Sequence, residues 1–169
     1  KFGKVSVEDV KAALQEDTIL VTIMYGNNEV GTIQPIAEIG ALLKDYQAVF
    51  HTDAVQAYGL IDLNVADLQV DLLSVSAHKL NGPKGIGFLY AKQGTKLHPL
   101  LVGGSQEKKR RAGTENIAST LGFAKAVELA TASREEKVAE YKKFKQLLIE
   151  QFEISGIDFK VNGHKTDVL

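Results

Sequence analysis

The 169-residue chain contains no cysteine, which excludes disulfide bonds and thiolate metal sites. No apolar run approaches the roughly 20 residues that a membrane-spanning helix needs, and the first residues lack the pattern of a signal peptide. We therefore expect a cytoplasmic protein. An excess of positive charge is also missing, because 20 basic and 21 acidic side chains give a net charge of −1. Neither nucleic acid nor an anionic membrane is an expected partner of such a chain.

The chain starts at Lys1 rather than at an initiator methionine, and it stops at Leu169 without a closing element. We therefore expect it to be a piece of a longer protein. Apolar residues make up 44% of the chain and charged residues 24%, which is typical of a globular protein. Its length is enough for one domain with a core, or for one domain and part of another.

Short apolar runs alternate along the chain with segments whose apolar residues recur every three or four positions. In the first such segment, Ile36, Ile39 and Leu43 share one face of a predicted helix. This alternation is typical of an α/β fold, a mostly parallel sheet with flanking helices. The apolar runs predict strands over residues 18–24, 48–53 and 85–91, a strand that starts with the run 70–73 and leads to Lys79, and a further short strand over 97–102.

A domain boundary is expected near residue 131. Ser133 followed by Glu136 has the spacing of a capping box and predicts a new helix in a different register. Residues 1–131 would then belong to one large domain. Residues 132–169 would form a connecting helix and, at 158–161, the first strand of a small α+β domain.

Three predicted strands end in polar residues, at 27–29, 51–56 and 74–79. In parallel sheets, ligands bind at the carboxyl ends of the strands, so these polar groups are expected to converge. If the alternation of a strand continues, Ser74, Ser76 and His78 share one face and Lys79 follows at its end.

An aldehyde cofactor requires an amine for a Schiff base, an anion to hold a pyridine nitrogen protonated, and donors for a phosphate. Lys79 offers the amine, Asp53 the anion, and Ser76 and His78 the phosphate donors. The type and spacing of these residues thus favour an active site at this edge of the sheet.

Other interpretations of the same residues stay open at this point. Lys79 could simply extend into water, and Asp53 could cap a helix that follows it. His51 and Asp53 could bind a metal with His78, although no fourth ligand is evident. A structural role for His51 is at least equally compatible with its position, and no role is evident for His98 or His164.

Four segments together resemble the cysteine desulfurase family (NifS/IscS-like), pyridoxal-phosphate enzymes of the class V aminotransferase group. Their order and spacing match over nearly the whole chain, which implies part of the large domain of a fold type I pyridoxal-phosphate enzyme. The segments are Asn27-Asn28-Glu29-Val30-Gly31, His51-Thr52-Asp53-Ala54-Val55-Gln56, Ser74-Val75-Ser76-Ala77-His78-Lys79 and Arg111-Ala112-Gly113-Thr114-Glu115-Asn116.

By this resemblance, pyridoxal 5'-phosphate is the cofactor and Lys79 carries it as a Schiff base. Asp53 is then expected to pair with the pyridinium nitrogen. Gln56 would hydrogen-bond to the phenolic oxygen of the ring, and Asn28 would lie beside the ring and contact the substrate. No metal is implied.

The resemblance also implies a homodimer with shared sites. Ser76 and His78 would bind the phosphate of the cofactor, and Thr114 would reach that phosphate from the second subunit. In the glycine-rich loop, Ser105, Lys108 and Lys109 stand where the family is expected to have Gly, Arg and Gly.

The implied reaction converts L-cysteine to L-alanine and passes the sulfur, as an enzyme persulfide, to an acceptor protein for iron–sulfur clusters or thiolation. The family's sulfur-accepting cysteine, its substrate-binding arginine and its ring-stacking histidine have no counterpart in these 169 residues. We therefore expect the chain to be inactive alone. A related lyase acting on selenocysteine or cysteine sulfinate is an alternative, as is a dimerising module without catalytic activity.

Overall fold

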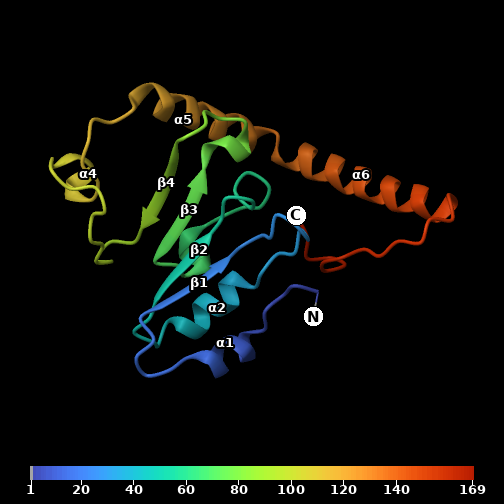
Figure 1. Cartoon of the computed structure of the whole chain (residues 1–169), viewed down its shortest axis with the longest axis horizontal. Coiled ribbons are helices and arrows are strands. Elements are labelled where there is room, and N and C mark those ends of the chain that lie inside the picture. The colour runs from blue at the N-terminus through green and yellow to red at the C-terminus, as the bar shows by residue number, and fades with distance from the viewer. Residues whose placement is uncertain (1) are drawn as a thin grey trace.

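The computed structural model describes residues 2–169 as a four-stranded sheet with helices packed against it (Figure 1). No helix in this part of the chain is long and apolar enough to cross a membrane. In chain order the elements are α1 (Val7–Ala13), β1 (Leu20–Met24), α2 (Ile36–Leu43), β2 (Val49–Asp53), α3 (Val65–Leu68), β3 (Leu72–Ser76), the 3-10 helix η1 (Ala77–Leu80), β4 (Gly87–Ala91), α4 (Gln106–Lys109), α5 (Ile117–Ala132) and α6 (Arg134–Ile154).

The sheet has the order β1-β2-β3-β4, in which the first three strands are parallel and β4 is an antiparallel edge. The predicted α/β fold with a mostly parallel sheet is therefore confirmed. The short strand expected over residues 97–102 does not form, because these residues pair with no strand of the sheet. The register aligns Met24 of β1 with Asp53 of β2, and Asp53 with Ser74 of β3. These three residues form one row across the carboxyl ends of the strands.

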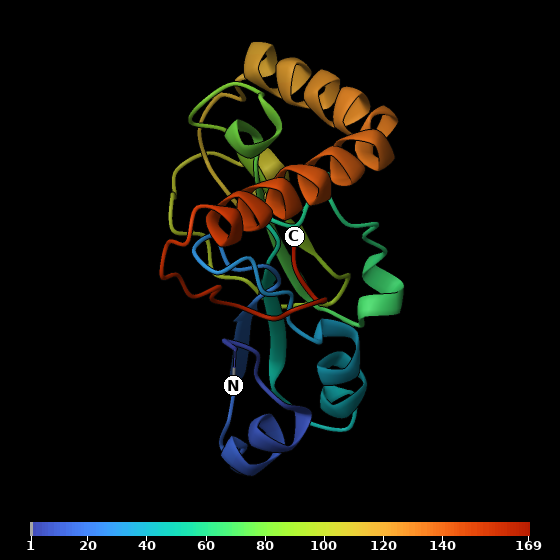
Figure 2. The ribbon, with the colours of Figure 1, turned by 90° about the vertical axis from the view of Figure 1, so that its right-hand side faces the viewer.

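Helices α1, α2, α3 and α5 cover one face of the sheet (Figure 2). Apolar residues of the strands point into this face, including Phe50, Leu73 and Val75, which are nearly or completely buried. They pack against Ile36 and Ile39 of α2. Because successive side chains of a strand point to opposite faces, the polar residues between them lie on the other side of the sheet. We call that opposite side the open face; it carries Thr22, Met24, His51, Asp53, Ser74, Ser76 and Leu89.

Helix α5 packs across η1 at the carboxyl end of the sheet. Its Phe123 stacks on Phe88 of β4 with a centroid distance of 5.6 Å, and its Ala126 is buried in the same core. Ala77 and Leu80 of η1 are buried there as well. The 3-10 helix is thereby fixed by two of its four residues.

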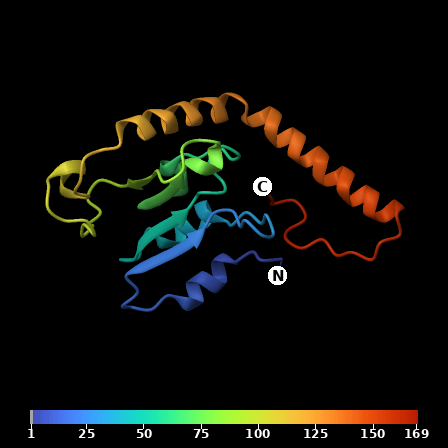
Figure 3. The ribbon, with the colours of Figure 1, turned by 45° about the horizontal axis from the view of Figure 1, so that its top comes forward.

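The break between α5 and α6 falls at Ser133, where a new helix was predicted. The predicted capping box is wrong, because the Ser133 hydroxyl donates to the Leu129 carbonyl oxygen of the preceding helix. Ser133 has φ −102° and ψ 7°, whereas a capping serine needs an extended backbone. No residue of α6 is buried, and the helix extends away from the sheet (Figure 3). That this break separates two domains stays a prediction.

Residues 158–161 do not form the predicted strand. No neighbouring strand is available to them, and an extended segment becomes a strand only by pairing. The chain instead returns to the loop after β1, where the Ile33 N–H donates to the Asp167 carbonyl oxygen at 2.9 Å. The Leu169 N–H donates to the Gly31 carbonyl oxygen at the same distance. This carboxy-terminal segment thus pairs with residues 31–33, beside the loop that carries Asn28.

Thr32 connects three distant segments through one hydroxyl group. The fully buried side chain donates to the Phe2 carbonyl oxygen at 2.8 Å and accepts the His164 N–H at 3.0 Å. Nearby, Lys4 forms an ion pair with Asp167, and this hydrogen bond lowers the pKa of the Asp167 carboxyl group. The start of the chain, the loop after β1 and the carboxy-terminal segment are therefore held together.

Replacing Thr32 with valine should lower the free energy of unfolding by about 1–3 kcal/mol, because the partly buried His164 N–H loses its acceptor and the fully buried hydroxyl bond to Phe2 is removed. Thr120→Val is the matched control, since that exposed hydroxyl bonds only to the Asn116 carbonyl oxygen of its own helix. It should change the free energy by no more than about 0.5 kcal/mol. Urea unfolding measures both values, and equal losses would contradict the connecting role of Thr32.

Candidate active site

The carboxyl ends of β1, β2 and β3 are joined by main-chain hydrogen bonds that continue beyond the strands. The Tyr25 N–H donates to the Asp53 carbonyl oxygen at 2.8 Å, and the Ala54 N–H donates to the Ser74 carbonyl oxygen at 3.0 Å. Asp53 is thereby held between its two neighbouring strands. Its side chain lies on the open face, in the row with Met24 and Ser74.

The Asp53 carboxylate uses one oxygen to stabilise the turn that follows β2. Its Oδ1 atom accepts the Val55 N–H at 2.9 Å, so the capping interpretation is correct to that extent, although residues 55–57 form a turn and not a helix. No other donor among residues 2–169 bonds to this carboxylate. The second oxygen, Oδ2, therefore keeps its capacity to accept a hydrogen bond.

Lys79 lies in η1, directly after β3, and its side chain is exposed. The amine forms no hydrogen bond or ion pair with any residue in the described range 2–169. Burial of Ala77 and Leu80 on either side fixes the backbone, and Asn81 ends η1 in the left-handed region with φ 59°. An unpaired amine is thus presented from a fixed turn at the carboxyl end of the sheet.

Ser76 and His78 lie together, although β3 ends at Ser76 and the strand alternation does not continue to His78, which belongs to η1. The Ser76 hydroxyl oxygen is 2.7 Å from Nδ1 of His78. If the hydroxyl group donates to Nδ1, Nε2 carries the ring proton and is a donor toward solvent. A hydroxyl group and an imidazole side by side can satisfy the oxygens of an anion.

The loop after β1 is shaped by Asn27, which the sequence did not single out. Its side-chain oxygen accepts the N–H groups of Glu29 and Val30, both at 2.9 Å, in the pattern of an Asx turn. Asn28 is exposed, and its amide donates to the Glu29 carboxylate at 3.3 Å. Gln56 is half-buried in the turn after β2 and has no hydrogen bond to another described residue.

Thr114 is exposed in the segment between α4 and α5. Figure 1 shows this segment at the end of α5 that lies away from η1. Thr114 has no hydrogen bond within residues 2–169, and it does not join Ser76 and His78 in this chain. Asp53 and Gln56 therefore lie at and just beyond the end of β2, and Ser76, His78 and Lys79 lie at the end of β3 and in η1. Of these residues Ser76 and His78 contact each other, and the segment with Thr114 lies apart from them (Figure 1).

His51 lies one row before Asp53 on the open face and contacts two hydroxyl groups. Its Nδ1 is 2.7 Å from the Thr22 hydroxyl oxygen, and its Nε2 is 2.9 Å from that of Ser74. Burial lowers the pKa of the His51 imidazole, while the charge of Asp53 acts in the opposite direction. With both nitrogens engaged, His51 does not form a metal site, and no cluster within residues 2–169 could hold a metal ion.

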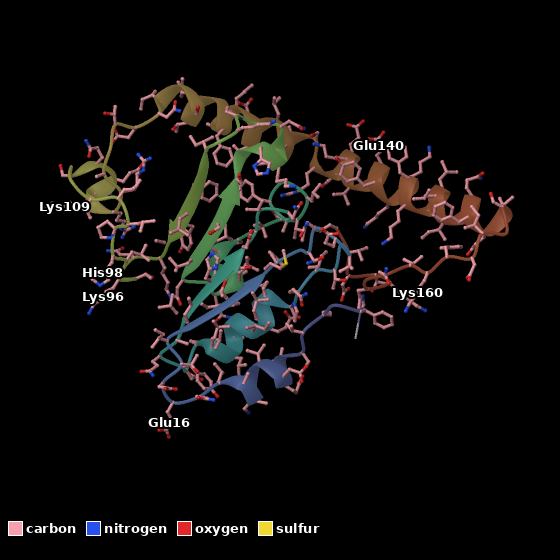
Figure 4. The ribbon with its side chains drawn as sticks, in the orientation of Figure 1. Glu16, Lys96, His98, Lys109, Glu140 and Lys160 are labelled. Atoms are coloured by element: carbon pink, nitrogen blue, oxygen red, sulfur yellow. The ribbon has the colours of Figure 1, made fainter. Side chains whose placement is uncertain are left out.

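A cavity of about 800 Å³ lies at the amino end of the strands, opposite the predicted site. Its lining includes Lys44, Asp71 and Lys96, and none of the predicted site residues. Figure 4 shows Lys96 and His98 at that end of the molecule, away from η1. The cavity is therefore separate from the convergence of Asp53, Ser76, His78 and Lys79.

The sequence profile described as "Aminotransferase class-V" matches residues 1–165. The chain belongs to the aminotransferase class-V family. This finding confirms the resemblance drawn from the four sequence segments.

Curated relatives in this family are similar over nearly the whole chain. A Bacillus subtilis (strain 168) protein, provisionally named cysteine desulfurase IscS 1, is 58% identical over 163 residues, which cover 96% of this chain and 43% of that protein. Cysteine desulfurase IscS of Methanosarcina thermophila is 50% identical over 169 residues, 100% of this chain and 42% of that protein. The chain thus spans less than half the length of these relatives.

Solved structures in the family have the same fold. DndA from Streptomyces lividans superimposes with a TM-score of 0.89 at 34% sequence identity, over 98% of this chain and 48% of that one. This agreement confirms the fold class predicted from the sequence. The chain matches about half of the larger DndA structure.

The lowered pKa of His51 predicts a pH dependence of stability. The unfolded chain binds a proton near the ordinary pKa of about 6.5, whereas the folded chain binds it only at lower pH. Between the folded and unfolded pKa values the unfolded state therefore binds more protons, so the free energy of unfolding should decrease as the pH falls through this range.

Denaturant unfolding at pH 7 and about pH 5 measures this decrease in the free energy of unfolding, which should be smaller for His51→Gln than for the parent chain. His98→Gln, which removes an exposed imidazole, is the control; an unchanged decrease in His51→Gln would contradict a buried, neutral His51.

Proposed function

We propose that the protein carrying this chain is a pyridoxal-5'-phosphate-dependent cysteine desulfurase. The observation that carries the proposal is the placement of an unpaired amine, a carboxylate and a hydroxyl–imidazole pair at the carboxyl ends of the neighbouring parallel strands β2 and β3. Similarity to proteins named cysteine desulfurase, at 48–58% identity, supports the choice of reaction. The products from L-cysteine would be L-alanine and an enzyme persulfide.

The groups on the open face fit this cofactor chemically. Lys79 would attach it through the exposed amine, and Oδ2 of Asp53 is available for the pyridinium N–H because Oδ1 is already used by Val55. Ser76 and His78 would bind the phosphate. The donor set therefore matches an aldehyde, a basic ring nitrogen and a dianion without requiring a metal.

When bound, pyridoxal phosphate supplies an electron sink for bonds to the α-carbon of an amino acid. Asp53 would keep the ring nitrogen protonated, and Gln56, in the turn after β2, would donate to the phenolic oxygen. The Nζ atom of Lys79 accepts and returns the α-proton of the substrate. Asn28, exposed on the loop after β1, contacts the substrate beside the ring.

The complete enzyme would act as a cytoplasmic homodimer that passes sulfur to an acceptor protein. These 169 residues contain no cysteine, so the sulfur-accepting thiol must come from another part of the protein. The chain alone should therefore release no sulfide from L-cysteine. The use of the sulfur in iron–sulfur cluster assembly or thiolation belongs to the same proposal.

Reduction with borohydride should attach the cofactor permanently to Lys79 in the full-length protein. Peptide mapping by mass spectrometry should find the pyridoxyl group on the peptide that contains Lys79 and lose it in Lys79→Ala. Lys84→Ala is the matched control, because this lysine lies five residues later in an exposed turn and should not affect the label. A label on Lys84, or no label on any lysine, would refute the assignment.

Mixed dimers test whether Thr114 acts across a subunit interface. Lys79→Ala and Thr114→Ala homodimers of the full-length protein should each have little activity. If Thr114 serves the partner's site, a mixed dimer has one site with both changes and one intact site, so about half the activity of a normal dimer returns. If Thr114 serves its own chain, each site keeps one change and mixing restores nothing, which would falsify the shared site.

A further inference from the structure

The His51 imidazole connects all three parallel strands by side-chain contacts on the open face. Nδ1 contacts Thr22 of β1, and Nε2 contacts Ser74 of β3, while the ring itself belongs to β2. The register places Ser74 directly beside Asp53. The ring of His51 therefore contacts the hydroxyl group that lies next to the carboxylate at the centre of the predicted site.

Ser74 is the neighbour of Asp53 across the parallel pair of β2 and β3. Because adjacent strands lie about 4.8 Å apart, the Ser74 hydroxyl could turn toward the Asp53 carboxylate. In the structure it contacts Nε2 of His51 instead, at 2.9 Å, and Asp53 accepts only the Val55 N–H. When Nδ1 of His51 carries the ring proton and donates to Thr22, Nε2 accepts the Ser74 O–H, and this hydroxyl group cannot also donate to Asp53.

We propose that His51 is a positioning residue, which reserves the Asp53 carboxylate for the cofactor ring by holding the Ser74 hydroxyl group. A hydroxyl group that donates to Asp53 would compete with the pyridinium N–H for the same oxygen and stabilise the carboxylate without the cofactor. His51 prevents this competition, and Thr22 fixes the ring from the other side. This inference rests on the proposed function.

The charge state of His51 supports the same role. Burial of the ring lowers the pKa of His51, so the imidazole stays neutral at physiological pH. A protonated ring one row from Asp53 would itself pair with the carboxylate and weaken its hold on the pyridinium nitrogen. Asp53 is the charged group that acts on this ring, and both ring nitrogens contact uncharged hydroxyl groups.

The test measures binding of pyridoxal phosphate to the full-length apoprotein by equilibrium dialysis, together with the visible absorbance of the bound cofactor. His51→Phe keeps a ring of similar size but releases Ser74, and it should raise the Kd about five- to tenfold and shift the absorbance maximum. His51→Gln, whose amide can still bond to Ser74, should stay within about twofold of the parent Kd.

The decisive variant is the double substitution His51→Phe with Ser74→Ala. Removing the released hydroxyl group ends the competition for Asp53, so both the Kd and the absorbance maximum should return toward those of the parent protein. If His51 served only to stabilise the sheet, Ser74→Ala would leave the defect unchanged or increase it, and that result would overturn the proposal.

Thr52→Val is the matched structural control. The Thr52 hydroxyl donates to the Ile23 carbonyl oxygen, so it also connects β2 to β1, but from the opposite and fully buried face. This variant should lower the thermal midpoint of the apoprotein without changing the cofactor spectrum. A spectral change as large as that of His51→Phe would overturn the proposal, because any loss of a link between the strands would then suffice.

Two further outcomes separate the inference from the proposed function. If the parent protein binds no cofactor at Lys79, the proposed function fails and this inference fails with it. If the parent protein binds normally and His51→Phe does so too, only the inference fails. If phenylalanine at position 51 prevents folding, Thr22→Val is the alternative variant, because it removes the contact at Nδ1 that holds the His51 ring. It should raise the Kd and shift the absorbance maximum less than His51→Phe does, and adding Ser74→Ala should reverse both effects. An unchanged Kd and spectrum in Thr22→Val would overturn the proposal.

Discussion

The hydrogen-bonded register of the three parallel strands is the constraint on which the candidate site depends. Main-chain bonds from Tyr25 to Asp53 and from Ala54 to Ser74 extend the pairing one residue past the strands. A shift of one residue would turn Asp53 into the apolar core and bring Thr52 to the open face. The position of each predicted functional group therefore follows from backbone pairing rather than from contacts among the groups themselves.

Helix packing on one face of the sheet maintains this arrangement. Phe50 and Val75 are buried against α2 and α5, which makes the strand register costly to change. The same packing holds η1, because Ala77 and Leu80 are buried beneath α5 while Lys79 between them is exposed. Apolar burial on one side thus allows polar and charged groups to stay accessible on the other.

Patterns within a single segment were sufficient to predict part of this site. Asp53 and Lys79 each follow an apolar run, and both lie at the carboxyl end of the sheet as expected. Ser76 and His78 were expected to share a strand face, but they meet because the chain turns into η1 after Ser76. Thr22 was missed because its contact with His51 depends on the register between two strands, which no local pattern encodes. The strand order and the antiparallel direction of β4 could not be predicted for the same reason.

Predictions failed where a local signal competed with its surroundings. Ser133 and Glu136 have the spacing of a capping box, but the hydroxyl group of Ser133 found the free Leu129 carbonyl oxygen at the end of α5. Residues 158–161 have the composition of a strand without a partner to pair with. Asn27 accepts the N–H groups of Glu29 and Val30 and so shapes the loop after β1, and the tendency of asparagine to form Asx turns would have identified it.

The pairing of residues 31–33 with the end of the chain has a consequence for the order of folding. These segments are separated by more than 130 positions, whereas β1, β2 and β3 pair with strands close to them in the sequence. Contacts between distant residues require a large loop to close, and they tend to form after local structure has restricted the chain. The sheet with Asp53 can therefore assemble early, and the loop with Asn28 acquires its final conformation late. Slow exchange of amide hydrogens should be concentrated in the strands, and the Asn28 loop should be among the first parts to open.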